Sequence, residues 1–158
     1  MMRQFEKALL DELAAKAAAS PRRRAHYNIH AAPEDPVQRF LVVADRDSYV
    51  RPHRHASKSE LALVLRGRFD VLTFDEQGVV TGRSTVGDDT PLMAFEVPHG
   101  TWHTLIAASD GSAFLEVKQG PYDPATASEF APWSPAEGDD AVVGYLQWLR
   151  GAQTGARS

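Results

Sequence analysis

The stretch PHRHASKSE, residues 52–60, places three candidate metal ligands within eight residues of one another. In an extended strand, residues two apart point to the same face, so the imidazoles of His53 and His55 project together. Four residues then form a turn, and Glu60 begins a strand that we expect to return antiparallel beside the first. A carboxylate would thus lie opposite two imidazoles. The later stretch PHGTWH, residues 98–103, adds a tight turn at Pro and Gly and a third imidazole, His103.

Three imidazole nitrogens and one carboxylate suit a single divalent transition metal ion such as zinc, iron, nickel, copper or manganese. The chain has no cysteine, which excludes thiolate sites, iron–sulfur clusters, disulfides and a cysteine nucleophile. A vestigial pocket without metal, or one in which these residues serve as acid and base, is the alternative.

The pattern HxH, four residues, Glu, six residues, Gly, from His53 to Gly67, resembles the first motif of the cupin superfamily, and PxGxxH, residues 98–103, resembles the second. Asp47, Leu92 and Ala107 replace two glycines and an asparagine that are usual near these motifs. The resemblance implies a cupin double-stranded β-helix, which is a jelly-roll barrel. It also implies one bound metal ion with four ligands, namely His53, His55, Glu60 and His103.

A narrower resemblance, to the WbuC-type cupin-fold metalloproteins, covers nearly the whole chain. It is carried by RAHYNIH (24–30), DPVQRF (35–40), YVRPHRH (49–55), EVKQGPYDP (116–124) and FAPW (130–133). Those proteins are associated with bacterial O-antigen polysaccharide gene clusters, and their chemistry is undefined. The resemblance therefore sharpens the expected fold and metal site but does not identify a reaction.

Between residues 24 and 118, short β-rich runs alternate with turn signals, as in a sandwich or barrel. No long helical pattern separates the runs, which argues against a parallel α/β sheet. The clearest runs are 40–44, 61–65, 69–74, 92–97, 103–107 and 113–118.

The two ends of the chain read as helical. Residues 3–19 form an amphipathic pattern that Ser20-Pro21 ends, and residues 142–149 carry a second apolar face that Gly151 ends, with Asp139 or Asp140 as its cap. The prolines of residues 120–138 indicate an irregular arm. We therefore expect an all-β cupin fold with an N-terminal helix and a short C-terminal helix. It would form a single domain over 1–158, with a helical segment 1–20, a barrel 24–118, and an arm and helix 119–158.

The 158 residues and the net charge of −4 fit a globular domain without general attraction for nucleic acid or anionic lipid. No run of about 18 apolar residues is present, so we expect no membrane span and take the cytoplasm as the location. The expected partner is a small-molecule ligand, and a homodimer is plausible because of the exposed barrel edges.

Other candidate site residues follow from alternation along the strands. Arg24, His26, Asn28 and His30 share one strand face, which lines either the pocket mouth or a solvated edge. The candidates for substrate binding are Arg24, Asn28, His30, Gln38 and Arg39, and those for acid or base are Glu116 and Tyr49.

These residues leave three kinds of function open. The first is a metal-dependent enzyme, such as an isomerase, epimerase or dioxygenase, that acts on a sugar or nucleotide-sugar intermediate of surface polysaccharide synthesis. The second is a non-catalytic module that binds a sugar or a small acid. The third is a metal-independent, epimerase-like cupin, against which the complete ligand set argues.

Overall fold

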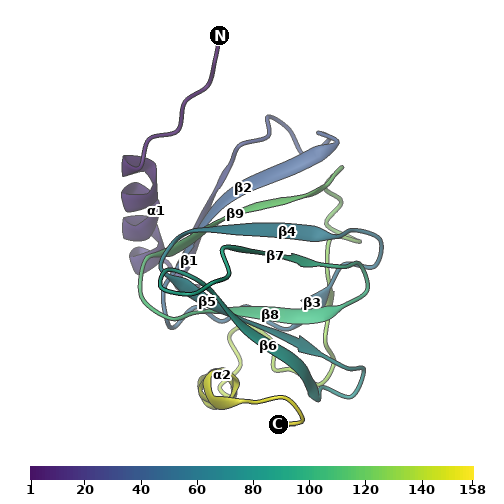
Figure 1. Ribbon diagram of the computed structural model, residues 1–158. Coiled ribbons are helices and arrows are strands. Elements are labelled where there is room, and N and C mark those ends of the chain that lie inside the picture. Colours follow the sequence, from purple (N-terminus) through teal and green to yellow (C-terminus); the bar gives the residue numbers. More distant parts are fainter.

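Two five-stranded antiparallel sheets lie face to face in the computed structural model, which describes residues 1–158 (Figure 1). The first sheet contains, in spatial order, β1 (Arg24–Asn28), β2 (Val37–Ala44), β9 (Ser112–Gln119), β4 (Glu60–Arg66) and β7 (Ala94–Val97). The second contains β10 (Glu129–Phe130), β3 (His53–Arg54), β8 (Trp102–Ala107), β5 (Arg68–Phe74) and β6 (Val80–Gly87). This is the predicted all-β jelly-roll architecture.

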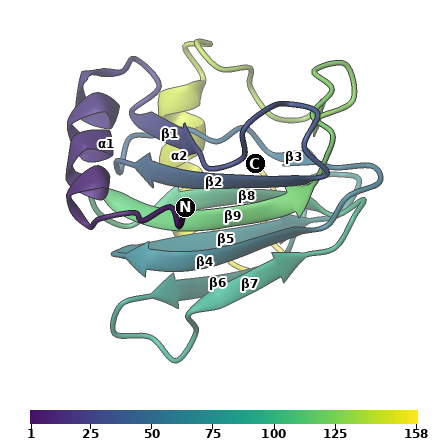
Figure 2. The same cartoon turned by 90° about the horizontal axis from the view of Figure 1, so that it is seen from above.

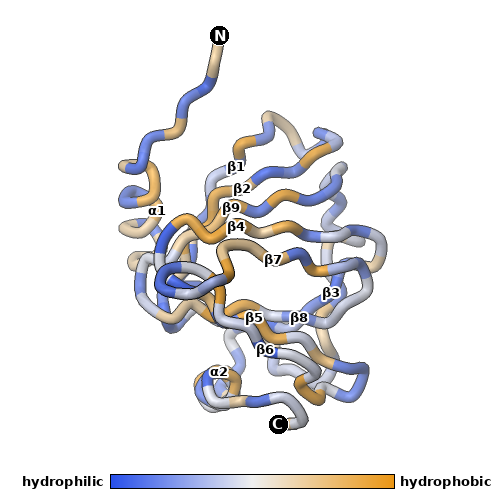
Figure 3. Tube along the Cα trace, in the orientation of Figure 1, coloured by the Kyte–Doolittle hydropathy of each residue, from blue (hydrophilic) through white to orange (hydrophobic).

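The inner faces of the two sheets are apolar at one end of the strands and polar at the other. At one end, apolar side chains from both sheets form a buried cluster in which the rings of Phe69 and Phe114 meet edge to face, 5.1 Å apart. In Figure 3 the ends of β9 and β4 nearest the N-terminal helix are hydrophobic, and their opposite ends are more hydrophilic. The apolar end closes the barrel, which leaves the polar end free to form a site.

Each sheet has one helix on its outer face. On the first sheet, α1 (Ala8–Ala19) buries Leu13 and Ala17 against β2 and β9. On the second, α2 (Val142–Gly151) packs Tyr145 and Leu146 into the largest apolar cluster. Figure 1 shows α1 at the upper left of the barrel and α2 below it. Neither helix is long and apolar enough to cross a bilayer.

The six predicted β-rich runs correspond to β2, β4, β5, β7, β8 and β9, and the C-terminal helix ends at Gly151 as expected. The N-terminal helix begins at Ala8 instead of residue 3, because Phe5 stays exposed and contacts Tyr27 on β1. Strand β6 was not predicted, since VTGRSTVG has few apolar residues. The arm is also less irregular than predicted, because it contributes β10.

The expected pairing of the two motif strands is wrong. Strand β3 pairs with β8 and β10 in the second sheet, and β4 pairs with β9 and β7 in the first. Residues 56–59 cross from one sheet to the other instead of forming a hairpin. Glu60 therefore reaches His53 from the opposing sheet, across the interior of the barrel.

The packing of α2 on the second sheet should be essential for stability. We expect Leu72→Ala to lower the free energy of unfolding by about 2–5 kcal/mol, because Leu72 is fully buried in the cluster beneath α2. Val143→Ala, in the same helix but 78% exposed, should change it by less than about 0.5 kcal/mol. Urea denaturation followed by circular dichroism measures both, and equal effects would contradict this packing.

Candidate metal centre

His53, His55, Glu60 and His103 converge at the polar end of the barrel. One ligand atom from each lies within 4.8 Å of every other. His53 and His103 are register partners on β3 and β8, and Glu60 arrives from β4 in the facing sheet. Glu60 is 2% exposed and His103 is fully buried. The structure thus brings all four predicted ligand residues together.

Backbone carbonyls fix the orientation of all three imidazoles. Nδ1 of His53 lies 2.9 Å from the carbonyl oxygen of Arg51, Nδ1 of His103 lies 2.9 Å from that of Thr101, and Nδ1 of His55 lies 2.6 Å from that of Ala127. A carbonyl only accepts hydrogen bonds, so each Nδ1 carries the proton and donates it. Each Nε2 is therefore the ring nitrogen left to bind a cation.

The Nε2 atoms lack the partners that a closed hydrogen-bond network would give them. Nε2 of His103 is buried and has no hydrogen-bond partner, and it lies 3.9 Å from a carboxylate oxygen of Glu60. Nε2 of His55 lies 2.9 Å from the other carboxylate oxygen, so a proton or a cation has to lie between them. An orphaned buried nitrogen and a set of three imidazoles with one carboxylate fit a divalent transition metal ion.

The electrostatics of the cluster also favour metal binding. Burial, with help from the neighbouring His103, lowers the pKa of His53 to about 3, and burial lowers the pKa of His103. Burial alone would raise the pKa of Glu60, but His55 and Lys118 lower it to about 2. Neutral imidazoles and an ionised carboxylate are the forms that bind metal ions.

A second charged group adjoins the cluster on the first sheet. Lys118 on β9 forms an ion pair of 2.6 Å with Glu116 on the same strand and lies 3.7 Å from Glu60. Burial, reinforced by the charge of Glu60, raises the pKa of Glu116 to about 7. A carboxyl group with that pKa can both give and take a proton near neutral pH.

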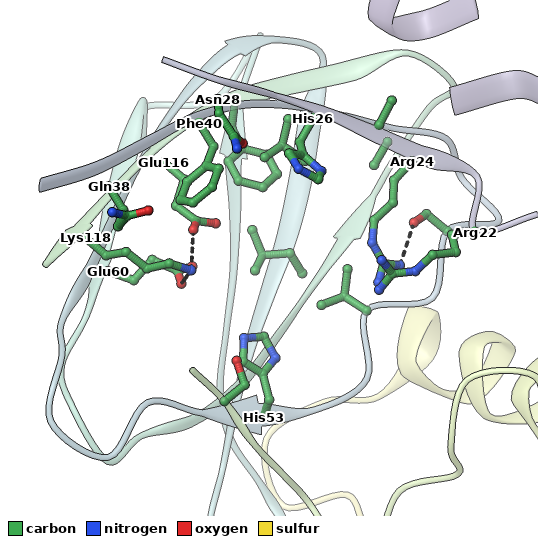
Figure 4. Close-up of a pocket in the computed structure, with 18 of the residues that line it drawn as sticks. Arg22, Arg24, His26, Asn28, Gln38, Phe40, His53, Glu60, Glu116 and Lys118 are labelled. Carbon is green, nitrogen blue, oxygen red and sulfur yellow. Dashed lines mark hydrogen bonds and ion pairs between the residues drawn. The ribbon is translucent and has the colours of Figure 1, made fainter. Parts of the chain in front are cut away.

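These groups face a cavity of about 570 Å³. Figure 4 shows Gln38, Glu60, Glu116 and Lys118 on one side of it and His53 below. The other predicted residues that line it are Arg24, His26, Asn28 and His30. Arg24, His26 and Asn28 on β1, with His30 just after it, thus line the cavity, and His26 and Asn28 are also exposed to solvent at this edge of the sheet.

Two of the residues that were predicted to belong to the site do not line the cavity. Arg39 is exposed and is not among the cavity-lining residues, because it follows Gln38 in β2 and alternation turns it to the outer face of the sheet. Tyr49 is buried in the cluster beneath α2, where its hydroxyl donates to the carbonyl of Pro135 and burial raises its pKa to about 12. Neither residue lies where it could act on a ligand in the cavity.

Sequence reasoning missed two parts of the site. Lys118 was not chosen, although its spacing of two from Glu116 predicts the same strand face. The arm was predicted only to be irregular, yet the carbonyl of Ala127 accepts a hydrogen bond from His55, and Glu129 pairs with Arg54 beside it. No spacing rule links Ala127 to His55, so the sequence carried no signal for that contact.

Solved structures share this architecture at low sequence identity. Capsular polysaccharide assembling protein CapF from Staphylococcus aureus aligns with a TM-score of 0.56 and 18% identity over 70% of this chain and 32% of its own. Protein SO0799 from Shewanella oneidensis aligns with a TM-score of 0.55 and 13% identity over 84% and 85%. Recombinant oxalate oxidase in complex with glycolate gives a TM-score of 0.53 and 17% identity over 84% and 68%. This chain thus spans about a third of CapF.

At such identities the likeness establishes the fold, which is that of the cupins. No curated protein matches the sequence. A family model described as "Domain of unknown function (DUF6016)" matches residues 5–86, which is just over half of the chain. The chain therefore belongs to the DUF6016 family and has a cupin jelly-roll fold whose three histidines and one glutamate could bind a metal ion.

Proposed function

We propose that this chain is a metal-dependent enzyme that acts on a polyhydroxylated small molecule, such as a sugar or nucleotide-sugar intermediate of surface polysaccharide synthesis. The observation that carries the proposal is the buried cluster of His53, His55, Glu60 and His103, the first three of which line the same cavity as the pair Glu116 and Lys118. A divalent metal bound by the cluster would supply a Lewis acid that polarises a carbonyl or activates water.

The proposed acid or base is Glu116. It lies on the cavity wall with a pKa near 7, and Lys118 beside it compensates the charge of its ionised form. Lys118 also lies 3.7 Å from Glu60, which belongs to the candidate metal-ligand cluster. A proton moved by Glu116 would therefore be transferred close to a metal-bound group of the ligand.

The cavity lining suits hydroxyl groups. The Oε1 atom of Gln38 is buried without a partner, while the amide nitrogen of the same side chain donates to the carbonyls of Pro33 and Asp35. A hydroxyl donor from a ligand would satisfy that oxygen. Asn28 adds an amide and Phe40 an apolar ring on the same wall (Figure 4), a mixture that fits a sugar with polar edges and an apolar face.

We also propose membership of the WbuC-type subgroup, because four of the five segments that carry that resemblance supply residues that line this cavity. They include the strand with His53 and His55 and the strand with Glu116. The structural likeness to a capsular polysaccharide assembling protein is compatible with a role in surface polysaccharide synthesis. A binding module without turnover would use the same cavity, and a substrate screen separates the two functions.

Metal retention tests the ligand assignment. Protein purified without chelators should hold about one equivalent of a transition metal, and His53→Ala combined with His55→Ala should hold less than about 0.1 equivalent, because two of four ligands are lost. His99→Ala, in an exposed turn, should retain the full amount. Plasma emission spectroscopy measures the metal and circular dichroism the fold. Unchanged metal content in the folded double variant would refute the assignment.

A comparison of kcat between variants at Glu116 and at Tyr49 tests whether Glu116 acts as the acid or base. After a screen of nucleotide sugars and sugar phosphates has found a substrate, Glu116→Gln should lower kcat by about 10²–10⁴ because the acid or base is removed. Tyr49→Phe should leave kcat nearly unchanged, because that hydroxyl lies outside the cavity. Metal content should be equal in both variants. Binding of the screened compounds without any turnover would favour the binding module instead.

A further inference from the structure

The outer face of the first sheet carries apolar side chains that nothing in the chain covers. Helix α1 packs mainly against β1 and β2, and it also contacts Ala113 of β9 and Arg66 at the end of β4, so the rest of β4 and the face of β7 remain open (Figure 2). Leu61 and Leu65 on β4 are 46% and 43% exposed. A contiguous apolar face of this kind marks an interaction surface.

One row across this face has a distinctive order of charges. Arg39 on β2 is the register partner of Val117 on β9, Val117 is the partner of Leu61 on β4, and Leu61 is the partner of Glu96 on β7. All four point to the outer face, because their neighbours Gln38, Lys118, Glu60 and Val97 form the corresponding inner row. The row thus runs from a cation through two apolar residues to an anion.

Both charges lack partners within the chain. The guanidinium of Arg39 and the carboxylate of Glu96 take part in no hydrogen bond and no ion pair, although many of the other arginines are paired. The two residues lie on strands that are separated by β9 and β4, so they cannot reach each other.

A second copy of the same chain fits this pattern. When two such faces stack about a two-fold axis parallel to the strands, the row of one copy lies over the reversed row of the other. Arg39 of each copy then faces Glu96 of its mate, and Val117 faces Leu61. A two-fold axis along the row would instead place Arg39 over Arg39, so the charges select the first arrangement.

We propose that the protein forms a homodimer through the outer face of β2, β9, β4 and β7, with Arg39 of each copy paired to Glu96 of the other. Contact between the two faces would bury Leu61, which is 46% exposed in a single chain, and complete the burial of Val117, which is half-buried there. The inner faces of the same strands line the cavity, so the surface is separate from the candidate metal centre.

Charge reversal tests the proposal directly. Light scattering after size exclusion should give the native protein twice the chain mass of 17.3 kDa. Arg39→Glu and Glu96→Arg should each weaken the dimer by at least about tenfold, because each creates two like-charge contacts. The double variant should restore affinity to within about threefold of the native protein, since the opposite pairs are re-formed with their signs exchanged.

Leu61→Asp should also give a monomer, and Val143→Asp, at an apolar position on α2 that is 78% exposed against 46% for Leu61, should stay dimeric. Circular dichroism and metal content should be unchanged in every variant. A monomeric native protein would overturn the proposal. So would a dimer that resists Leu61→Asp, or single reversals that the double variant does not rescue.

Discussion

The site is organised around one buried negative charge, the carboxylate of Glu60. A carboxylate that is 2% exposed is costly to bury unless cations or hydrogen-bond donors surround it. Lys118 on the neighbouring strand supplies one cation, and His55 lies at hydrogen-bonding distance. Nε2 of His103, 3.9 Å from the carboxylate, is buried and has no hydrogen-bond partner. Burial and, after it, the same charge raise the pKa of Glu116, and the charge also favours binding of a cation by the cluster.

Short-range strand geometry explains what the sequence could predict. The spacing of His53 and His55, the tight turn before His103 and the runs that became β2, β4, β5, β8 and β9 all depend on alternation and turn chemistry, which act over a few residues. The motif resemblance supplied the long-range part, namely that the two motifs meet in a jelly roll.

The errors concern interactions between segments that are distant in the sequence. Residues 56–59 are compatible with a hairpin, and only the sheet partners of β3 and β4 send the chain across the barrel. Tyr49 has a chemistry that suits catalysis, but the cluster beneath α2, which depends on residues almost a hundred positions later, buries it away from the cavity. The contact of Ala127 with His55 is of the same kind.

Adjacent residues on one strand can serve unrelated roles in this fold. Gln38 presents an unsatisfied oxygen to the cavity, and Arg39, one position later, presents an unpaired cation to the outer face. The same alternation places Lys118 and Glu60 on the inner face of the sheet and their neighbours Val117 and Leu61 on the outer face. Because four strands carry both rows, stacking of the outer faces would restrain the strands that hold Glu60 and Lys118 without placing any residue in the cavity. The candidate metal centre and the proposed interface therefore lie on opposite faces of the same strands and share no side chain, which is why loss of the dimer should leave metal content unchanged.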